Sequence, residues 1–481
     1  MPESKPTDAM RALREAIPRA NADPARPAYH FVPPAQWMND INGTIFHKGQ
    51  YHVFYQHNPF GDMPTGEKLA HMHWGHARSS DLVNWEHLPI ALAPSLETGE
   101  KSCWSGCAAI DGSGDPIIIY TSVSEDQMPF TKPFTQAAAL GDERLLSWRK
   151  YGRNPILSIE KHGPPRSSGE WRDPFVFKTG AGTFLILGAC GDAGIPLFQA
   201  RDETLLNWKH VGSLAPENVE CPNFFELGRK WILISSPFDL VKYAAGTFDL
   251  ESLEFSPQAV GIVDWGACYG TNVLTDDMGR RILFGWIPGW NWELFQIGRG
   301  WNGCMALPRV LTLDAKHRIL QEPAAELKKL RVHESLVEKT KVALDDSQSP
   351  LRAQIDFQSE VLAELSAITA AECGLRFFSG ENVIDIKCHP QRLLIEVADT
   401  PVPLPSGEQS RLSLHVFIDR SVVEIYINDG EVVVSKMFNT ALTNPRLEVY
   451  ARDGSMKIDS LRVWRLNAAE RKFAYPELDN I

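Results

Sequence analysis

Five short apolar runs recur through the first three hundred residues of this chain, each directly after a glycine-containing turn. They are YHVFYQ, PIIIYT, TFLILG, KWILIS and RRILFGW, and they begin at residues 51, 116, 183, 230 and 280. Each run is rich in β-branched and aromatic residues, which favour strands. Another strand-like run precedes each turn, so each repeat predicts a β-hairpin. Hairpins at this blade-sized spacing are typical of β-propellers.

A second landmark follows the first three runs. Trp85, Trp148 and Trp208 each come after an acidic or polar turn and a leucine, and FDLESLEFSP at 248 is a weaker fourth copy. Each aromatic residue is expected to begin an outer strand. A jelly roll or a stacked sandwich does not need such long-range self-similarity, so the repeats predict a five-bladed β-propeller.

The second part of the chain has a different composition. Thirteen of the 14 tryptophans lie at or before Trp301, and strand patterns with turn signals dominate again from about residue 343. This pattern predicts an all-β chain with a β-sandwich after the propeller, which braces it. The expected segments are an N-terminal extension (1–27), the propeller (28–320), a linker that is helical in part (321–342), the sandwich (343–467) and a C-terminal tail (468–481).

The overall charge restricts the partners. The chain has 481 residues and a net charge of −12, which argues against nucleic acid and anionic membranes and is compatible with a neutral sugar. The eight cysteines form no CxxC pair, and the first residues contain no apolar core of a signal peptide. No apolar run is long enough to span a bilayer. We expect reduced cysteines, a cytoplasmic location and a monomer or homodimer.

Polar residues recur at one position of the repeats, upstream of the hairpin turn. The first strand of each propeller blade lines the central channel, so equivalent positions converge at one end of the axis. The residues at this position are Asp40, Trp104 with Ser105, Arg172 with Asp173, Glu220, and Tyr269. The repeat therefore predicts one pocket in which Asp40, Asp173 and Glu220 meet, together with Arg172, Trp37 and Trp104.

Clustered carboxylates have three possible uses. A metal site would need more oxygen ligands at short spacing, and a structural ion-pair network would have Arg172 neutralise its neighbours. Glycoside hydrolysis needs one carboxylate as nucleophile or base and another as acid, in environments that separate their pKa values. The aromatic surroundings favour the third use, because the apolar faces of sugar rings stack on indole.

The motifs WMNDING, WRDP and ECP resemble the three acidic motifs of glycoside hydrolase family 32, the invertase, inulinase and levanase family. FYQHNP, MHWGHARSSDLVNW, WNGCMALPRVL and VFIDRSVVEIYINDG look like further signatures of this family, and the resemblance runs from about residue 27 to about residue 466. It implies a five-bladed propeller followed by a β-sandwich. It also implies cleavage of β-fructofuranosyl bonds with retention of configuration, on sucrose or fructans, without a cofactor or metal.

The resemblance assigns roles residue by residue. Asp40 would be the nucleophile, Glu220 the general acid and base, and Asp173 the stabiliser of the transition state. The substrate-binding residues would be Trp37, Asn39, Gln56, Trp74, Trp104, Ser105, Arg172 and Tyr269.

Three physical expectations follow from these roles. Glu220 has to stay protonated near neutral pH, which apolar surroundings or a nearby Asp40 carboxylate would favour. Arg172 would keep Asp173 ionised. Pro174 would hold Asp173 in an extended strand.

The chain departs from the family pattern at two positions. Ile41 stands where the family has proline after the nucleophile, which predicts a looser turn, and Leu69 stands where many members have a tryptophan in the pocket wall. His71, His73 and His76 have the look of metal ligands, but MHWGH is itself part of the resemblance. Three rival functions stay open: a fructosyltransferase, a non-catalytic fructan-binding protein, and a five-bladed arabinose- or xylose-releasing enzyme.

Overall fold

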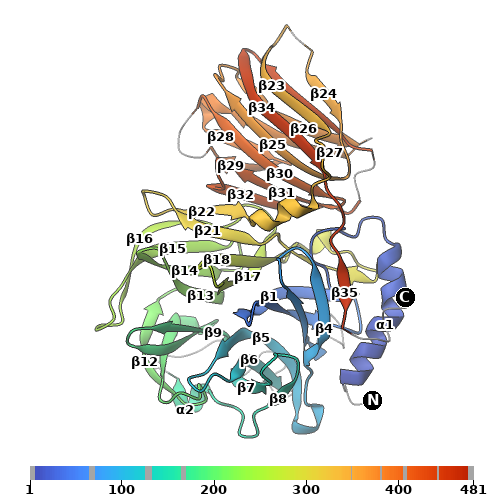
Figure 1. Cartoon of the computed structure of the whole chain (residues 1–481). Helices are drawn as coiled ribbons and strands as arrows, with labels where there is room; N and C mark the ends of the chain where they lie inside the picture. Colours follow the sequence, from blue (N-terminus) through green and yellow to red (C-terminus); the bar gives the residue numbers. More distant parts are fainter. Residues whose placement is uncertain are drawn as a thin grey trace.

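The computed structural model describes residues 6–63, 71–124, 133–163, 170–347, 349–379, 382–404, 409–440 and 444–474. The chain is all-β, apart from helix α1 (Pro6–Ala22), the single-turn helix α2 (Ile159–His162) and short 3₁₀ turns (Figure 1). The sequence patterns did not predict α1, which lies within the expected N-terminal extension. No helix in the described ranges is long and apolar enough to cross a membrane, and all eight cysteines are free and buried.

Five sheets occupy the first part of the chain, and each begins with an antiparallel hairpin. Their strands, sheet by sheet, are β1 (Gln36–His47), β2 (Gln50–Asn58), β3 (His73–Ser79) and β4 (Trp85–Leu92); β5 (Glu100–Ile110), β6 (Pro116–Ser124), β7 (Thr135–Gly141) and β8 (Trp148–Lys150); β9 (Arg172–Thr179), β10 (Gly182–Gly188), β11 (Ile195–Ala200) and β12 (Trp208–Ala215); β13 (Glu220–Leu227), β14 (Lys230–Ser236), β15 (Lys242–Phe248) and β16 (Phe255–Ile262); and β17 (Tyr269–Thr275), β18 (Arg281–Ile287), β20 (Cys304–Met305), β21 (Arg309–Leu313) and β22 (Ile319–Pro323).

The hairpins predicted from the apolar runs are confirmed. Each of the five runs forms the second strand of its sheet, namely β2, β6, β10, β14 and β18. The aromatic landmarks are also where they were expected, because Trp85, Trp148, Trp208 and Phe255 are the first residues of the outer strands β4, β8, β12 and β16.

The first strands of the five sheets lie around a common centre (Figure 1). β1 contacts β5, β5 contacts β9, β9 contacts β13, β13 contacts β17, and β17 contacts β1. Two distant segments extend the first sheet at its edges: β19 (Trp301–Asn302) pairs in parallel with β1, and β35 (Arg471–Phe473) pairs in parallel with β4. The starts of the five inner strands therefore meet at one place.

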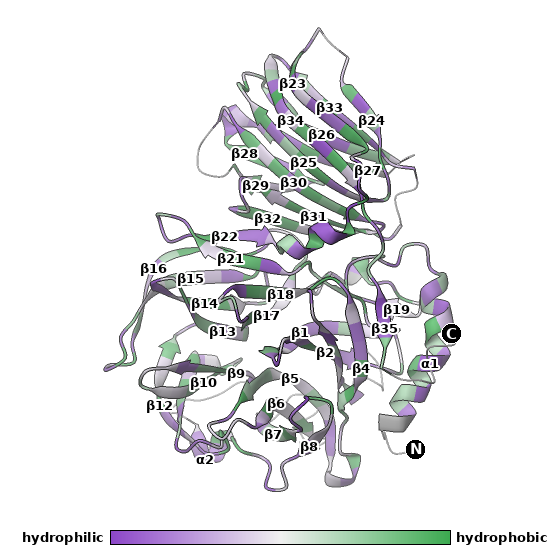
Figure 2. Ribbon diagram, viewed as in Figure 1, coloured by the Kyte–Doolittle hydropathy of each residue, from purple (hydrophilic) through white to green (hydrophobic). Residues whose placement is uncertain are grey.

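Two further sheets of six strands each follow a 3₁₀ turn at Ala325–Leu330. Their buried faces pack on each other around an aliphatic core, and apolar and polar residues alternate along the strands in Figure 2. The strands are β23 (Val337–Asp345), β34 (Ser455–Arg465), β25 (Gln358–Ser366), β30 (Leu412–Asp419), β31 (Val422–Ile427) and β32 (Val432–Met437); and β24 (Leu351–Gln354), β33 (Arg446–Arg452), β26 (Glu372–Ser379), β27 (Asn382–His389), β28 (Leu394–Val397) and β29 (Thr400–Pro403).

A buried charge cluster joins these two sheets to the first part of the chain. Arg309 Nη2 lies 2.9 Å from Asp264 Oδ2 and 2.8 Å from Glu424 Oε2. His30 contacts Asp419 through Nδ1 at 2.9 Å and Glu424 through Nε2 at 3.2 Å. All five side chains are completely buried. We call these five residues the junction cluster.

Candidate active site

A shift in the pairing register interrupts the inner hairpin of each of the five sheets in the first part of the chain. The pairing register shifts between Met38 and Ile41 in β1, between Trp104 and Gly106 in β5, opposite Asp173 and Pro174 in β9, between Glu220 and Asn223 in β13, and between Tyr269 and Asn272 in β17. A β-bulge bends its strand and re-aims the side chains beside it. Five bulges at equivalent positions therefore turn polar side chains toward the common centre.

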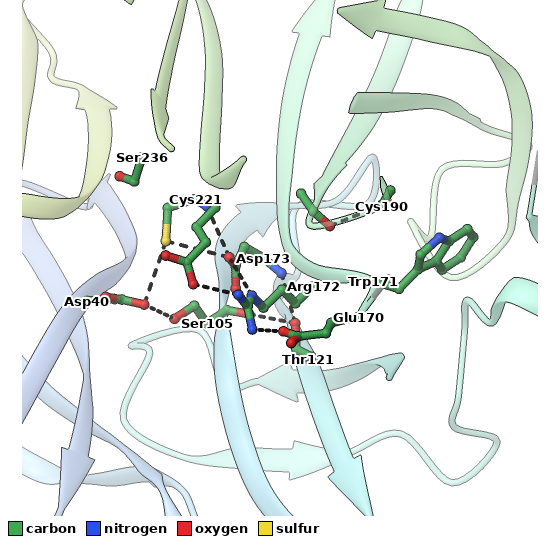
Figure 3. Close-up of polar contacts among 12 residues, drawn as sticks. Asp40, Ser105, Thr121, Glu170, Trp171, Arg172, Asp173, Cys190, Cys221 and Ser236 are labelled. Carbon is green, nitrogen blue, oxygen red and sulfur yellow. Dashed lines mark hydrogen bonds and ion pairs between the residues drawn. The ribbon is translucent and has the colours of Figure 1, made fainter. Parts of the chain in front are cut away.

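Asp40 lies in the bulge of β1 and is fixed through one of its carboxylate oxygens (Figure 3). Ser105 Oγ donates a hydrogen bond to Oδ2 at 2.7 Å, and Cys221 Sγ lies 3.6 Å from the same oxygen. Oδ1 is buried and has no hydrogen-bond partner among the described residues. Gly270 lies directly against it, because a Cβ at that position would be 2.3 Å from Oδ1. One oxygen is thus held by side chains, and the other packs against Gly270 without a hydrogen-bond partner among the described residues.

Asp173 lies in the bulge of β9 with a φ of 62°, in the left-handed region. The expectation that Pro174 holds it in extended geometry is therefore wrong. Its backbone N–H donates to Thr121 Oγ1 at 2.9 Å, and its Oδ2 accepts from the backbone N–H of Cys221 at 3.0 Å. Burial raises the pKa of Asp173 to about 6, against the opposing charge of Arg172 and with the support of the Asp40 carboxylate.

Glu220 begins β13, and both of its carboxylate oxygens have partners. Oε1 lies 2.6 Å from Arg172 Nη2, and Oε2 accepts a hydrogen bond from Tyr269 Oη at 2.5 Å. Burial raises the pKa of Glu220 to about 7; Arg172 opposes this shift, and the charges of Asp173 and Asp40 add to it. A carboxyl group that titrates near neutral pH can both give and take a proton there.

Arg172 is shared among several groups and does not serve Asp173 alone. Its Nη1 pairs with Glu170 Oε2, its Nη2 pairs with Glu220, and its Nε is 3.7 Å from Asp173 Oδ2 (Figure 3). The guanidinium group also lies over the ring of Trp104, 5.7 Å from its centroid. The expectation that Arg172 keeps Asp173 ionised is therefore wrong. The short contacts of Arg172 go to the two glutamates, and its charge does not prevent burial from raising the pKa of Asp173.

These side chains surround one pocket at the centre of the five sheets. It is lined by Asn39, Asp40, Gln56, Met72, Trp104, Ser105, Arg172, Asp173, Glu220 and Trp290. The Asp40 carboxylate has one oxygen without a hydrogen-bond partner among the described residues, and it shares the pocket with the carboxyl group of Glu220, whose pKa is about 7. Such a pair can support nucleophilic and acid–base chemistry in the same cavity.

Comparisons with known proteins agree with this geometry. The family model described as Glycosyl hydrolases family 32 N-terminal domain matches residues 30–323, and the model described as Glycosyl hydrolases family 32 C terminal matches residues 326–465. The chain belongs to glycosyl hydrolase family 32. It is therefore a glycoside hydrolase.

Individual family 32 relatives align along most of their length. A sucrose-6-phosphate hydrolase of Zymomonas mobilis is 30% identical over 92% of this chain and 92% of its own. A levanase of Bacillus subtilis is also 30% identical, over 91% of this chain and 70% of its own. Among solved structures, a GH32 beta-fructofuranosidase of Bombyx mori superposes with a TM-score of 0.81 at 28% identity and covers 96% of this chain and 98% of its own.

Three expected substrate-binding residues do not line the pocket of this family 32 enzyme. Trp37 and Trp74 are completely buried; Trp37 Nε1 donates to Asn39 Oδ1 at 2.7 Å, and Trp74 Nε1 donates to the carbonyl of Trp104 at 3.0 Å. Tyr269 acts on the pocket through its hydrogen bond to Glu220. All three side chains lie behind the lining residues, and their hydrogen bonds orient Asn39, Trp104 and Glu220.

The two departures from the family pattern have different outcomes. Ile41 is buried and pairs with Tyr55 in the first sheet, so the looser turn expected after Asp40 is wrong. Leu69 lies outside the described residues. Met72, three residues further along the chain, lines the pocket.

The histidines of HMHWGH have no metal-site geometry. No group of three possible metal ligands occurs within the described ranges. His73 and His76 are buried, and burial lowers the pKa of both imidazoles, to about 3 for His73. The His76 ring stacks on Phe54 with 4.0 Å between centroids, so these side chains are part of the packing between β2 and β3.

Several residues at the site had no sequence signal that we used. Met72 and Trp290 line the pocket, but neither lies at the position that the repeats share. Cys221 and Glu170 contact the carboxylates and Arg172. Cys221 is the central residue of ECP, and Glu170 directly precedes WRDP, so the polarisable and charged residues in and beside these motifs were a usable signal.

Proposed function

We propose that this chain is a retaining β-fructofuranosidase that acts on sucrose or on fructo-oligosaccharides and fructans. The observation that carries the proposal is the pairing of Asp40 and Glu220 in one pocket. Asp40 presents a buried oxygen without a hydrogen-bond partner among the described residues, and Glu220 has a pKa of about 7. Retaining glycosidases need a carboxylate nucleophile and a proton donor in one pocket.

In the first step, a carboxylate oxygen of Asp40 attacks C2 of the fructosyl unit. The bond from C2 to the leaving oxygen breaks as Glu220 gives its proton to that oxygen, and a fructosyl ester of Asp40 forms. In the second step, Glu220 takes a proton from water, the water oxygen attacks C2, and the ester bond breaks. Glu220 is protonated again, Asp40 is a carboxylate again, and configuration at C2 is retained.

The remaining lining residues have supporting roles. Asp173 would accept hydrogen bonds from ring hydroxyl groups and stabilise the positive charge that develops at C2. Asn39, Gln56, Ser105 and Arg172 would bind the fructosyl unit. Trp104 would stack on its apolar face.

The relatives support this substrate class. Their names describe a sucrose-6-phosphate hydrolase and a levanase, and one Bombyx mori structure is a mutant in complex with sucrose. All of these act on or bind fructosides, so the fructosyl unit is the common element that we assign to the pocket.

The five sheets support a more detailed fold assignment. Their inner strands contact one another in a ring and their outer strands begin at the repeated aromatic residues. We assign them to the five blades of a propeller over residues 28–320, with the two six-stranded sheets as a β-sandwich over residues 343–467. A monomer or homodimer in the cytoplasm remains our expectation.

A panel of sucrose, raffinose, inulin and levan, with product chromatography, tests the activity. Free fructose is expected from at least one of them, and release from none would contradict the proposal. Reaction in aqueous methanol tests the stereochemistry, because retention gives methyl β-fructofuranoside and inversion gives the α-anomer. Accumulation of longer oligosaccharides instead of fructose would identify the chain as a fructosyltransferase, which uses the same ester.

A further inference from the structure

One segment of the pocket wall is built from the stretch between β18 and β20. We call residues 288–302 the wall segment. It carries Trp290, which lines the pocket, and Phe295, whose ring packs edge-on against Trp37 with 4.8 Å between centroids. Trp37 in turn donates its hydrogen bond to the lining residue Asn39. The position of the wall segment therefore affects the pocket both directly and through β1.

The end of α1 and the residues after it hold the wall segment from outside. Arg19 Nη2 donates to the carbonyl of Gly298. Asp23 Oδ2 accepts from Trp301 Nε1 at 2.9 Å and from Arg299 Nη1 at 3.3 Å. The Asp23 side chain is only 11% exposed, so these hydrogen bonds are shielded from water.

The backbones of the two segments are also in direct contact. Gly300 has a φ of 78°, and a Cβ at this position would lie 3.1 Å from the backbone N of Ala20. On its other side, the carbonyl of Gly300 accepts from the backbone N–H of Gln36 at 2.6 Å, where β1 begins. Gly300 is thus enclosed between α1 and the strand that carries Asp40.

Helix α1 is anchored where it can support this contact. Its buried residues recur at spacings of four, four and three residues on one face and pack into a cluster with Trp301 and Ile287. These residues are Ala9, Leu13, Ile17 and Ala20.

We propose that α1 and Asp23 are a positioning device for the catalytic pocket: they hold the wall segment so that the pocket binds the fructosyl unit tightly, without touching substrate themselves. The proposal rests on the proposed function for the identity of the ligand. Trp290 and Asn39 line the pocket and supply neither the proposed nucleophile nor the proposed proton donor, so we expect them to contribute equally to binding the substrate and the transition state. Loosening them therefore removes uniform binding, which raises KM and leaves kcat nearly unchanged.

The test compares Asp23→Ala with Asp23→Asn, on whichever fructoside of the panel the unaltered chain cleaves. Asp23→Ala removes the acceptor for Trp301, so KM is expected to rise by about 3- to 10-fold with kcat within about twofold. The inhibition constant of fructose, which reports on the pocket alone, should rise in the same proportion. Asp23→Asn keeps an oxygen at the same place, so KM and the inhibition constant should return to within about twofold of the original values.

Val449→Ala serves as the control for lost stability alone, because Val449 is buried in the core of the two C-terminal sheets. It should lower the melting temperature and leave KM and the fructose inhibition constant unchanged. A folded Asp23→Ala chain with unchanged KM, or with lowered kcat at unchanged KM, overturns the proposal. If Asp23→Ala does not fold, Arg19→Met decides by the same criteria, with a rise of at least about threefold expected in KM. An unaltered chain that cleaves no fructoside would instead refute the proposed function.

Discussion

The catalytic pocket and the junction cluster are both built from buried carboxylates, but their pKa values are shifted in opposite directions. In the pocket, burial raises the pKa of Asp173 to about 6 and that of Glu220 to about 7. In the junction cluster, the pKa of Glu424 is lowered to about 2 and that of Asp419 is also lowered, although burial opposes both shifts. Burial is therefore common to both sites and does not decide the direction in which the pKa values shift.

The partners of the carboxylates explain the difference: the charge of Arg309 is the largest influence that lowers the pKa of Glu424, the His30 hydrogen bond is the largest that lowers the pKa of Asp419, and further hydrogen-bond donors add to both. Asp419 accepts the backbone N–H groups of residues 28, 29 and 30 as well as the His30 ring, and Glu424 accepts from Arg309, His30 and the backbone of Leu307. In the pocket, Arg172 is divided among several carboxylates, and Asp40 keeps one oxygen without a partner among the described residues. Carboxylates whose oxygens all accept hydrogen bonds, as in the junction cluster, are stabilised in their ionised form. Carboxylates with too few partners, as in the pocket, which we call undersaturated, can still exchange protons near neutral pH.

The opposite shifts have opposite effects on stability. A carboxyl group with a raised pKa, such as Glu220, stabilises the fold fully only below its unfolded pKa, and this contribution is lost as the pH rises through about 7. A carboxyl group with a lowered pKa, such as Glu424, stabilises the fold above its unfolded pKa. At neutral pH the junction cluster therefore contributes stability that the pocket lacks.

The largest expected effect is on activity at the pocket. Asp40→Ala removes the proposed nucleophile, so kcat/KM for the cleaved fructoside should fall by roughly 10⁴-fold or more. The melting temperature should stay the same or rise, because the substitution removes one of several crowded carboxylates. Activity assays paired with thermal unfolding measure both. Retained activity would refute the role of Asp40, and a large loss of stability would break the contrast between the two clusters.

The next effect is on stability at the junction cluster. Arg309→Met leaves Asp264 and Glu424 buried without their cation, so the free energy of unfolding should fall by about 3–5 kcal/mol. Arg318→Met is the matched control: Arg318 also pairs with two carboxylates but is 31% exposed, so the loss should be below about 1 kcal/mol. Urea unfolding measures both variants. Equal losses in the two variants would show that burial of the junction cluster does not increase the cost of removing its cation.

A slightly smaller effect is expected from the titration of the junction histidine. Its two carboxylate partners raise the pKa of His30 to about 9 against the opposing effect of burial, which is the largest single influence. The stabilisation is fully present below the unfolded pKa of about 6.5 and is lost as the pH rises through about 9, by a total of about 3 kcal/mol. Urea unfolding between pH 6 and pH 10 should show this decline. His30→Gln should be less stable at pH 6 and should show a flatter profile; an unchanged slope would exclude His30 as its source.

The repeating part of the structure could be predicted from the sequence because strands and turns are specified by residues close together in the chain. Apolar runs, glycine turns and aromatic landmarks gave the hairpins and the starts of the outer strands, for example at Trp148 and Trp208. The same register brought Asp40, Asp173 and Glu220 to one level of the inner strands. Each of these features needs only the alternation and spacing of neighbouring residues.

The details that failed depend on contacts that sequence spacing does not contain. A bulge shifts the register at Asp173 by one position, which no residue pattern signals, and it places that residue in left-handed geometry. Trp37 and Trp74 adjoin motif residues, but their side chains point into the core. Trp290 reaches the pocket from a non-repeating segment. Helix α1, by contrast, has a local signal, because its buried residues recur at helical spacing, although Pro18 interrupts the pattern.

The smallest expected effect concerns the charge balance around Arg172. Activity requires protonated Glu220, so kcat/KM should decline as the pH rises through about 7. Glu170→Gln removes an anion from Arg172 and leaves more of its positive charge to act on Glu220. The alkaline decline should therefore move to lower pH, by about half a unit, because Glu170 is partly exposed and its charge is screened. Glu251→Gln, in an exposed turn, should leave the profile unchanged. A decline that does not move, or moves to higher pH, would show that Glu170 has no part in keeping the pocket undersaturated.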